Sequence, residues 1–341
     1  MQVKVTGVGT SSVPADAGAV VLNVTGTEAD GNGFVTVWPC GSTQPTASNL
    51  NLQAGITSPN LVVAKVGTAG MVCLFTQSSA HLIADVNGYM PASSKYTSVV
   101  PERLLDTRAP AQVGYIGGKP AAGSTVQIQV AGAGATNVPG TAKAAVLNVT
   151  ATEADGDGFV TVWPCGSLQP NASNLNIPAG GTAPNLVVSK IGDGGRVCIF
   201  VQASMHLIAD INGFMPVEST YVSVVPERLL ETRAAGQTGY TGGKPAAGAT
   251  VELTVTGAGT TNVPAGTTAV VLNVTGVEPD ADGYVTVYPC GAIRPTASNL
   301  NLRSGAISPN LVMSKIGDGG KVCIFTQSPT HLIADVNGYW P

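Results

Sequence analysis

Short stretches in which apolar and polar residues alternate run along the whole chain, separated by turns rich in Gly, Pro, Asn and Asp. Alternation of this kind is typical of strands with one buried face. The turn residues supply the positive φ that tight hairpins need. In the first part of the chain the pattern predicts strands at residues 19–25, 34–38, 48–52, 60–66, 71–76 and 81–87.

The same pattern returns every 125 residues, since Cys40, Cys165 and Cys290 differ by 165 − 40 = 290 − 165 = 125. Residues 80–89 recur almost unchanged as 205–214 and 330–339, and no insertion interrupts the register. Three full copies would need 3 × 125 = 375 residues, 34 more than the 341 present, and the first copy lacks a counterpart of 92–125. We therefore predict three modules, at 1–91, 92–216 and 217–341, with the first one N-terminally truncated.

Each full module contains about eight strand signals once residues 103–108 and 125–130 are added. Strands spaced by about 8–12 residues predict an all-β fold, here a β-sandwich of the Greek-key or jelly-roll type. A closed barrel is the alternative. A module of 125 residues is large enough to bury its own core, unlike a solenoid repeat of about 20–45 residues. This length favours modules strung like beads.

Each module carries one pair of cysteines, 33 residues apart, without a Cys-x-x-Cys motif. One pair per module and a low content of charged residues predict disulfides within each module, and so an oxidising compartment. Two buried free thiols are the alternative. The predicted bonds are Cys40–Cys73, Cys165–Cys198 and Cys290–Cys323.

Charge and hydropathy exclude two classes of partner. The net charge is 16 − 20 = −4, which leaves no positive excess to neutralise phosphates, so we expect no nucleic acid. Apolar runs stop at four or five residues, far short of the roughly 20 that span a bilayer as a helix. We expect no membrane span, no metal and no cofactor.

The chain also resembles a known kind of module. Val-Val-Pro-Glu-Arg-Leu-Leu-Asp-Thr-Arg at 99–108, Ser-Asn-Leu-Asn at 48–51 and Ile-Ala-Asp-Val-Asn-Gly-Tyr at 83–89 carry the likeness, and Glu231 replaces the Asp in the copy at 224–233. The resemblance is to tandem repeat modules of secreted actinobacterial surface and cell-wall-associated proteins, and it covers essentially the whole sequence. It implies a bacterial, extracellular accessory role, secreted or at the cell surface, with no catalytic residue to transfer.

The candidate site is a set of polar residues that recurs in one strand of every module. At a period of two, His81, Ile83, Asp85 and Asn87 share one strand face. A His and an Asp four residues apart could form an acid–base pair, but no nucleophile elbow or paired carboxylates accompany them. A polar network that pins strands and turns explains the same residues, and a ligand site is the other alternative. The members are His81, Asp85, Asn87, His206, Asp210, Asn212, His331, Asp335 and Asn337.

Three further motifs have specific alternatives. Lys65 and its copies lie among valines and could form an isopeptide bond with an Asn, or bring the amine to the surface. The Asp-Gly-Asn-Gly turn at 30–33 could bind calcium, although a hairpin turn explains it. Trp38, Trp163 and Tyr288 could pack over the disulfides or offer a sugar platform.

These observations favour a non-catalytic extracellular repeat array that serves as a stalk, adhesive or surface-attachment element. Its partners would be other copies of itself or a cell-surface glycan. The alternative is a carbohydrate-binding accessory module that targets an attached hydrolase to a polysaccharide. An enzyme is the least favoured class.

Overall fold

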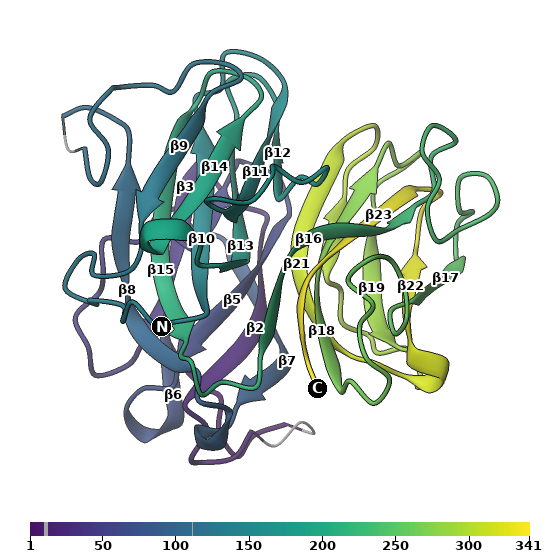
Figure 1. The fold of residues 1–341 in the computed structure, drawn as a ribbon, viewed down its shortest axis with the longest axis horizontal. Coiled ribbons are helices and arrows are strands. Elements are labelled where there is room, and N and C mark those ends of the chain that lie inside the picture. Colours follow the sequence, from purple (N-terminus) through teal and green to yellow (C-terminus); the bar gives the residue numbers. More distant parts are fainter. Residues whose placement is uncertain (10–12, 111) are drawn as a thin grey trace. The chain divides into compact units, whose positions relative to one another are not determined.

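The structure is a computed structural model that describes residues 1–9, 13–110 and 112–341 (Figure 1). Over these residues the chain is all-β, with twenty-three strands and four short 3-10 helices. The strands form six small sheets, in which every pair of named strands is antiparallel. The predicted all-β class is confirmed.

The strands follow the repeat in the sequence. Residues 1–91 (repeat 1) contain β1 (Gln2–Lys4), β2 (Ala19–Thr27), β3 (Gly33–Pro39), β4 (Leu50–Leu52), β5 (Ser58–Lys65), β6 (Met71–Thr76) and β7 (His81–Met90). Residues 92–216 (repeat 2) contain β8 (Thr97–Asp106), β9 (Thr125–Gln129), β10 (Ala144–Thr152), β11 (Gly158–Pro164), β12 (Leu175–Ile177), β13 (Thr182–Lys190), β14 (Arg196–Val201) and β15 (His206–Met215). Residues 217–341 (repeat 3) contain β16 (Val222–Glu231), β17 (Thr250–Thr254), β18 (Ala269–Val277), β19 (Gly283–Pro289), β20 (Leu300–Leu302), β21 (Ile307–Lys315), β22 (Lys321–Thr326) and β23 (His331–Trp340). The 3-10 helices are η1 (Thr68–Gly70), η2 (Ala92–Ser94), η3 (Asp193–Gly195) and η4 (Asp318–Gly320).

Two sheets in each repeat contribute to one hydrophobic core. In repeat 2 the sheets have the strand orders β13-β10-β15-β8 and β12-β11-β14-β9. Leu105 and Val149 from the first sheet and Ile128 and Val162 from the second belong to one cluster and are at most 1% exposed. Val, Ile and Leu at alternate positions place their side chains on the inner face of each sheet, and burial of that face drives the pairing.

The chain divides into two compact units. Unit 1 consists of Met1–Gln169 and Leu175–Thr220, and unit 2 consists of Pro170–Asn174 and Tyr221–Pro341. Unit 1 therefore contains repeat 1 and most of repeat 2. Hydrogen bonds from the buried side chain of Asn60 to the Asn148 side chain and the Leu186 backbone join these two repeats, which are not isolated beads within the unit.

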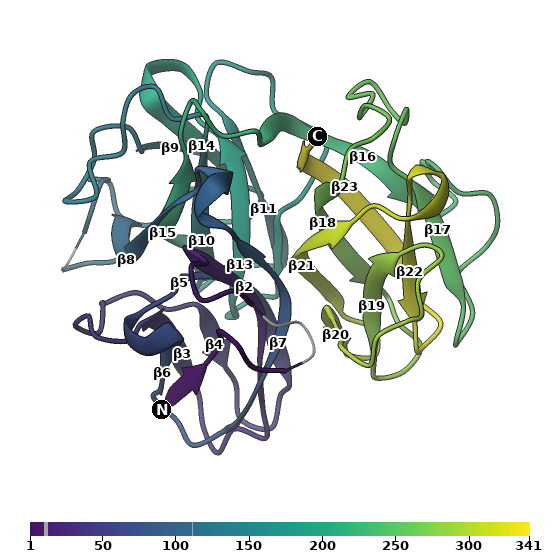
Figure 2. The same ribbon diagram turned by 90° about the horizontal axis from the view of Figure 1, so that it is seen from below.

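Over the described residues, the first repeat has seven strands and the other two have eight. Its second sheet has the order β5-β2-β7, and β2 and β7 lie side by side in Figure 2. In repeat 2 the equivalent sheet has a fourth strand, β8, which pairs with β15, and in repeat 3 β16 pairs with β23. The segment with the Arg-Leu-Leu-Asp-Thr-Arg motif thus pairs with the repeat that follows it.

Most predicted strands are close to the observed ones, and two of the differences have a physical reason. The strand predicted at 103–108 begins earlier, at Thr97, and includes Pro101. A proline is tolerated there because β8 is an edge strand, where a missing N–H breaks no ladder on the open side. The strand predicted at 48–52 is shortened to Leu50–Leu52, because only these residues pair with β3, while the carbonyl of Ser48 accepts from Asn148 of the next repeat.

All three predicted disulfides are present. Cys40 bonds Cys73, Cys165 bonds Cys198, and Cys290 bonds Cys323, with Cα–Cα distances of 5.0, 5.1 and 5.0 Å. Each bond links the residue that follows one strand to the adjacent strand of the same sheet. In repeat 1, Cys40 follows β3 and Cys73 lies in β6. Disulfides are typical of proteins in an oxidising, extracytoplasmic environment.

Candidate functional site

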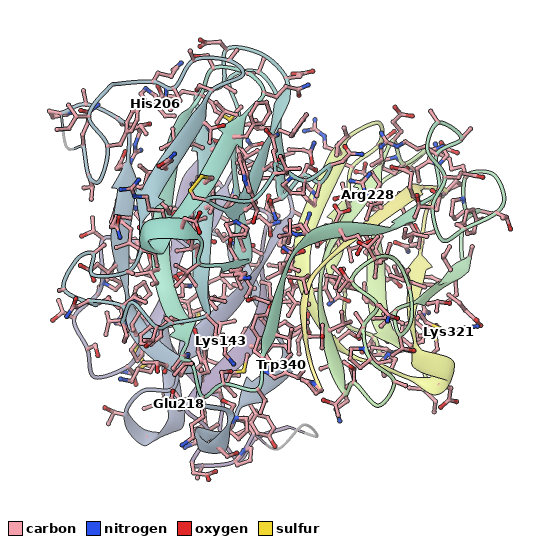
Figure 3. The ribbon with its side chains drawn as sticks, viewed as in Figure 1. Lys143, His206, Glu218, Arg228, Lys321 and Trp340 are labelled. Carbon is pink, nitrogen blue, oxygen red and sulfur yellow. A yellow bond between two sulfur atoms is a disulfide. The ribbon has the colours of Figure 1, made fainter. Side chains whose placement is uncertain are left out.

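In repeats 2 and 3, the histidine of the candidate network forms a hydrogen bond with the threonine that directly follows the edge strand. His206 Nδ1 lies 2.9 Å from Thr107 Oγ1, and His331 Nδ1 lies 3.1 Å from Thr232 Oγ1 (Figure 3 labels His206). Thr107 Oγ1 also accepts the backbone N–H of Leu207 at 3.0 Å. The His and Asp of one strand therefore do not form the acid–base pair considered from the sequence, because each has a different partner.

The aspartates of the network bind arginines of the neighbouring edge strand. Arg103 Nε donates to Asp210 Oδ1 at 2.8 Å and Nη1 donates to Asp106 Oδ2 at 3.0 Å, while Arg108 Nη2 donates to Asp106 at 2.7 Å. The side chain of Asp210 has no exposed surface, and that of Arg103 is 18% exposed. A buried carboxylate is tolerable only when paired in this way.

The same cluster recurs in repeat 3 with a longer acid. Arg228 Nε donates to Asp335 Oδ1 at 2.6 Å, and Arg228 and Arg233 both donate to Glu231 (Figure 3 labels Arg228). Glu231 takes the place of Asp106 without loss of either ion pair. The cluster ties β16 to β23 as its counterpart ties β8 to β15.

Burial and charge act in opposite directions on these carboxyl groups. Burial raises the pKa of Asp210 above its usual range, and the hydrogen bond and charge of Arg103 offset this only in part. Burial also acts to raise the pKa of Asp106, but the hydrogen bonds from Arg108 and the charges of Arg108 and Arg103 outweigh it and hold that pKa below its usual range. The pKa of Glu231 is lowered against the same burial effect by Arg233 and Arg228.

The asparagines predicted for the network lie apart from it. The partner of Leu147 in β15 is Ile211 and the partner of Val146 is Gly213, so Asn212 is the extra residue of a β-bulge. Asn87 and Asn337 occupy the same bulge in their repeats. The bulge breaks the strict period of two, so these asparagines do not continue the face of His and Asp. Within the described part of the chain, the buried side-chain amides of Asn212 and Asn337 have no hydrogen-bond partner.

A second group of recurrent asparagines joins repeat 1 to repeat 2 inside unit 1. Asn60 Nδ2 donates to Asn148 Oδ1 at 2.8 Å, Asn60 Oδ1 accepts from Leu186 N at 3.2 Å, and Asn148 Nδ2 donates to Ser48 O at 2.7 Å. Asn60 and Asn148 have no exposed surface. Arg103 adds a bond from Nη2 to Thr46 O at 3.1 Å. The candidate network is therefore continuous with the contact between two repeats.

Part of this contact recurs in unit 2. Asn273, the counterpart of Asn148, donates from Nδ2 to Ser173 O at 2.7 Å. Ser173, the counterpart of Ser48, lies in Pro170–Asn174, the segment of repeat 2 that belongs to unit 2. The sequence showed that these asparagines recur, but not that their partners lie 100 residues away.

The first repeat has the strand residues of the network without the arginine. Asp85 is partly buried, and burial raises the pKa of its carboxyl group. His81 is exposed and its Nε2 lies 3.8 Å from Glu28 Oε2, with both side chains 78% exposed. The network is therefore complete in repeats 2 and 3 only.

Two glutamates with a defined role were missed from the sequence. The carboxylate of Glu102 accepts the backbone N–H groups of Ala135 and Thr136 at 2.5 and 2.6 Å, and that of Glu227 accepts those of Thr260 and Thr261 at the same distances. Against burial, hydrogen bonds from the hydroxyls of Thr136 and Thr261, together with these backbone bonds, lower the pKa of both glutamates. The sequence signal for these glutamates was their recurrence at the second position of both copies of the Pro-Glu-Arg-Leu-Leu motif.

The other motifs have structural explanations. Lys65, Lys190 and Lys315 are exposed at strand ends, outside the core that an isopeptide bond would require. Asn32 of the Asp-Gly-Asn-Gly turn accepts the N–H of Ala54, and Asp157 of repeat 2 accepts that of Ala179. Among the residues that the structure describes, no group of three or more His, Cys, Asp or Glu side chains is placed to hold a metal ion.

The aromatic residues beside the disulfides do not form an open platform in repeat 2. Trp163 is 6% exposed and clusters with Cys165 and Cys198, and its Nε1 donates to Ser167 O. A hollow of about 820 Å³ in unit 1 is lined by residues such as Gln129 and Asn137 and by glycine backbone, and none of its described lining is aromatic. Over the described residues, no helix has the length and apolar character that crossing a bilayer demands.

Comparisons with known proteins give only remote likenesses. No family model and no curated protein matches the chain. A solved structure described as the triple jelly roll fold and turret assembly of an archaeal virus is 9% identical over 95% of this chain and 80% of its own, with a TM-score of 0.21. A structure of Sulfolobus Turreted Icosahedral Virus is 10% identical over 96% and 81%, with a TM-score of 0.22. The N-terminal CBM22-1-CBM22-2 tandem domain of Paenibacillus barcinonensis Xyn10C is 11% identical over 70% and 98%, with a TM-score of 0.19. Likenesses this weak carry no argument about the function of this chain.

Proposed function

We propose that the protein is a non-catalytic extracellular array of three β-sandwich modules, with a structural role such as a stalk or a surface-attachment element. In this proposal the His and Asp residues of repeats 2 and 3 hold strands together, and Asn60 and Asn148 hold successive repeats together. They do not bind a substrate.

The observation that carries the proposal is the buried joint of Asn60, Asn148 and Ser48, which is continuous with the ion pairs of Arg103 and Asp210. A catalytic or ligand-binding carboxylate needs free acceptor capacity that faces solvent or a cleft. Both carboxylate oxygens of Asp210 instead accept hydrogen bonds from Arg103, and the carboxylate also accepts one from the backbone N–H of Ser48. The side chain has no exposed surface. Side chains that are buried and bonded to each other are suited to holding parts of a protein in place.

The three disulfides support the extracellular part of the proposal, because such bonds persist in oxidising compartments. Fractionation of the native host with thiol titration tests this part. Protein recovered from the cytosol with six free thiols would overturn it.

The joint is tested with Asn148→Ala in the intact chain. The change leaves Asn60 Nδ2 and Ser48 O without this partner in a buried site, which costs about 1–3 kcal/mol. We expect faster hydrogen exchange in both β5 and β10, strands of different repeats. Asn32→Ala is the control, because Asn32 bonds only within its own repeat at an exposed turn. If Asn148→Ala affects β10 alone, the joint does not couple the repeats.

Carbohydrate binding is the competing function, and a polysaccharide pull-down with the intact chain separates the two. The structural proposal predicts no retention on cellulose, chitin, xylan or peptidoglycan. Saturable retention that a soluble oligosaccharide competes away would overturn it in favour of a glycan-binding module.

A further inference from the structure

One strand of repeat 1 has an open edge that its counterparts do not have. β7 pairs with β2 through Ala19–Thr27, and among the described residues no strand pairs with its other edge. The counterparts β15 and β23 are covered on that edge by β8 and β16. An uncovered edge presents unpaired N–H and C=O groups that can accept another strand.

The apolar residues of β7 are exposed where their counterparts are buried. Ile83 is 49% exposed, whereas Ile208 and Ile333 are 6% and 7% exposed. Ala84 is exposed, whereas Ala209 has no exposed surface. The sequence of the strand is almost the same in all three repeats, so the missing neighbour accounts for the exposure.

The polar residues of β7 lack the partners that their counterparts have. Asp210 and Asp335 each bind an arginine of the covering strand, and a residue with that charge is absent from the described surroundings of Asp85. His206 meets Thr107, whereas His81 is exposed. Both differences disappear if a strand with arginine and threonine at these positions lies along β7.

A glycine in β7 shows where an aromatic side chain would fit. A Cβ atom on Gly213 would lie 2.1 Å from the hydroxyl of Tyr96, and one on Gly338 would lie 2.1 Å from that of Tyr221. These two tyrosines precede β8 and β16 and lie directly over the glycines. At Gly88 the same position has nothing within 4 Å. The surface over Gly88 thus has room for the tyrosine ring.

We propose that the open edge of β7 is a docking surface for an extended segment with the sequence character of residues 96–108. The segment would run antiparallel to β7, with its arginine opposite Asp85 and its tyrosine over Gly88, as Arg103 lies opposite Asp210 and Tyr96 over Gly213. A second copy is a poor donor, because its own strands of this type are committed. Leu105 and Leu230 have no exposed surface, and ion pairs hold both strands.

The test uses the intact protein and a fluorescent peptide with the sequence of residues 95–109. We expect saturable binding of one peptide per chain, new protection from hydrogen exchange at 81–90, and a melting temperature that rises with peptide concentration. A peptide with arginine replaced by alanine at the position of Arg103 should bind at least about tenfold more weakly, the factor that 1.4 kcal/mol represents. A scrambled peptide should not bind.

Two variants of the protein locate the site. Gly88→Ala leaves the uncovered strand unstrained, since nothing lies within 4 Å, but places a methyl group where the peptide's tyrosine would lie. Asp85→Ala removes the acceptor for the arginine. Both should weaken binding by about tenfold or more. Asp30→Ala removes an exposed acid from a loop of the same repeat and should bind the peptide like the unmodified protein.

Three results would overturn the proposal. They are no binding at millimolar peptide, binding that neither Gly88→Ala nor Asp85→Ala weakens, and binding that protects 206–215 or 331–340 in place of 81–90. Analytical sedimentation of the protein with and without the peptide supplies a fourth result that would overturn the proposal. If the protein forms dimers that protect β7 and the peptide does not dissociate them, the occupant is a second copy and not a separate segment.

Discussion

The replacement of Asp210 by alanine tests whether the buried ion pair holds the edge strand β8 in its sheet. The variant removes the carboxylate that accepts from Arg103 at 2.8 and 3.3 Å and leaves the guanidinium in a largely buried position. The chain contains its own control. Asp85 occupies the same position in repeat 1 and binds no arginine of a covering strand.

The expected loss follows from the burial of the two groups. Removal of one partner of a buried ion pair costs about 3–5 kcal/mol. Arg103 is 18% exposed and keeps Asp106 at 3.0 Å, which places the loss near the lower end of that range, at about 3 kcal/mol. For a unit the size of Met1–Gln169 with Leu175–Thr220, this corresponds to a fall in melting temperature of about 6–12 °C.

Calorimetry of the intact chain at pH 7 measures the fall, and hydrogen exchange locates it. Protection should be lost first in β8 and in the facing edge of β15. Asp335→Ala should have the same effect on β16 and β23. Asp85→Ala should change the free energy of unfolding by much less, because Asp85 is only partly buried and its removal leaves no arginine without a partner.

The reasoning would be refuted if Asp210→Ala and Asp85→Ala had equal effects. In that case the cost of dehydrating Arg103 and Asp210 would cancel their attraction, and the backbone pairing with β15 and the apolar contacts of Leu104 and Leu105 would hold β8 without the ion pair.

Three further predictions concern acid, the disulfides and one glycine. Four carboxylates on the edge strands β8 and β16 have a lowered pKa in the folded protein. Their contribution to the free energy of unfolding is therefore complete above about pH 5 and is lost as the pH falls below about 4. Urea unfolding at pH 7, 4 and 3 should show this decrease in the free energy of unfolding. The four are Glu102, Asp106, Glu227 and Glu231. The double variant Cys165→Ala/Cys198→Ala, which opens a loop of 33 residues, should lower the free energy of unfolding of unit 1 by about 3–4 kcal/mol in urea, and an unchanged midpoint would contradict this. Gly213→Ala should lower the melting temperature, because its Cβ would lie 2.1 Å from the hydroxyl of Tyr96, while Gly88→Ala should leave it unchanged; equal effects would show that the tyrosine gives way.

Local pattern was enough to predict the all-β class, the strand positions and the disulfide pairs. These features depend on neighbours in the sequence or on a repeated spacing. Alternation of apolar residues sets which face of β9 or β17 is buried, and two cysteines that recur 33 residues apart in every repeat are each other's obvious partners. The strand at Met71–Thr76 is predicted to the residue.

Contacts between distant segments were decided only by the tertiary structure. The sequence places His206, Asp210 and Asn212 on one strand, but the bulge removes Asn212 from their face, and the partners of the other two come from β8 and the residue after it, about 100 positions earlier. Asn148 recurs in every repeat, but only the tertiary structure shows that it joins two repeats through Asn60. No periodicity encodes such pairs, because they depend on which sheet edges meet when the cores form. For the same reason, nearly identical strands in the three repeats differ in exposure: Ile83 and Ile208 have the same neighbours in sequence, but Ile83 has a strand on one side only, whereas Ile208 lies between two strands.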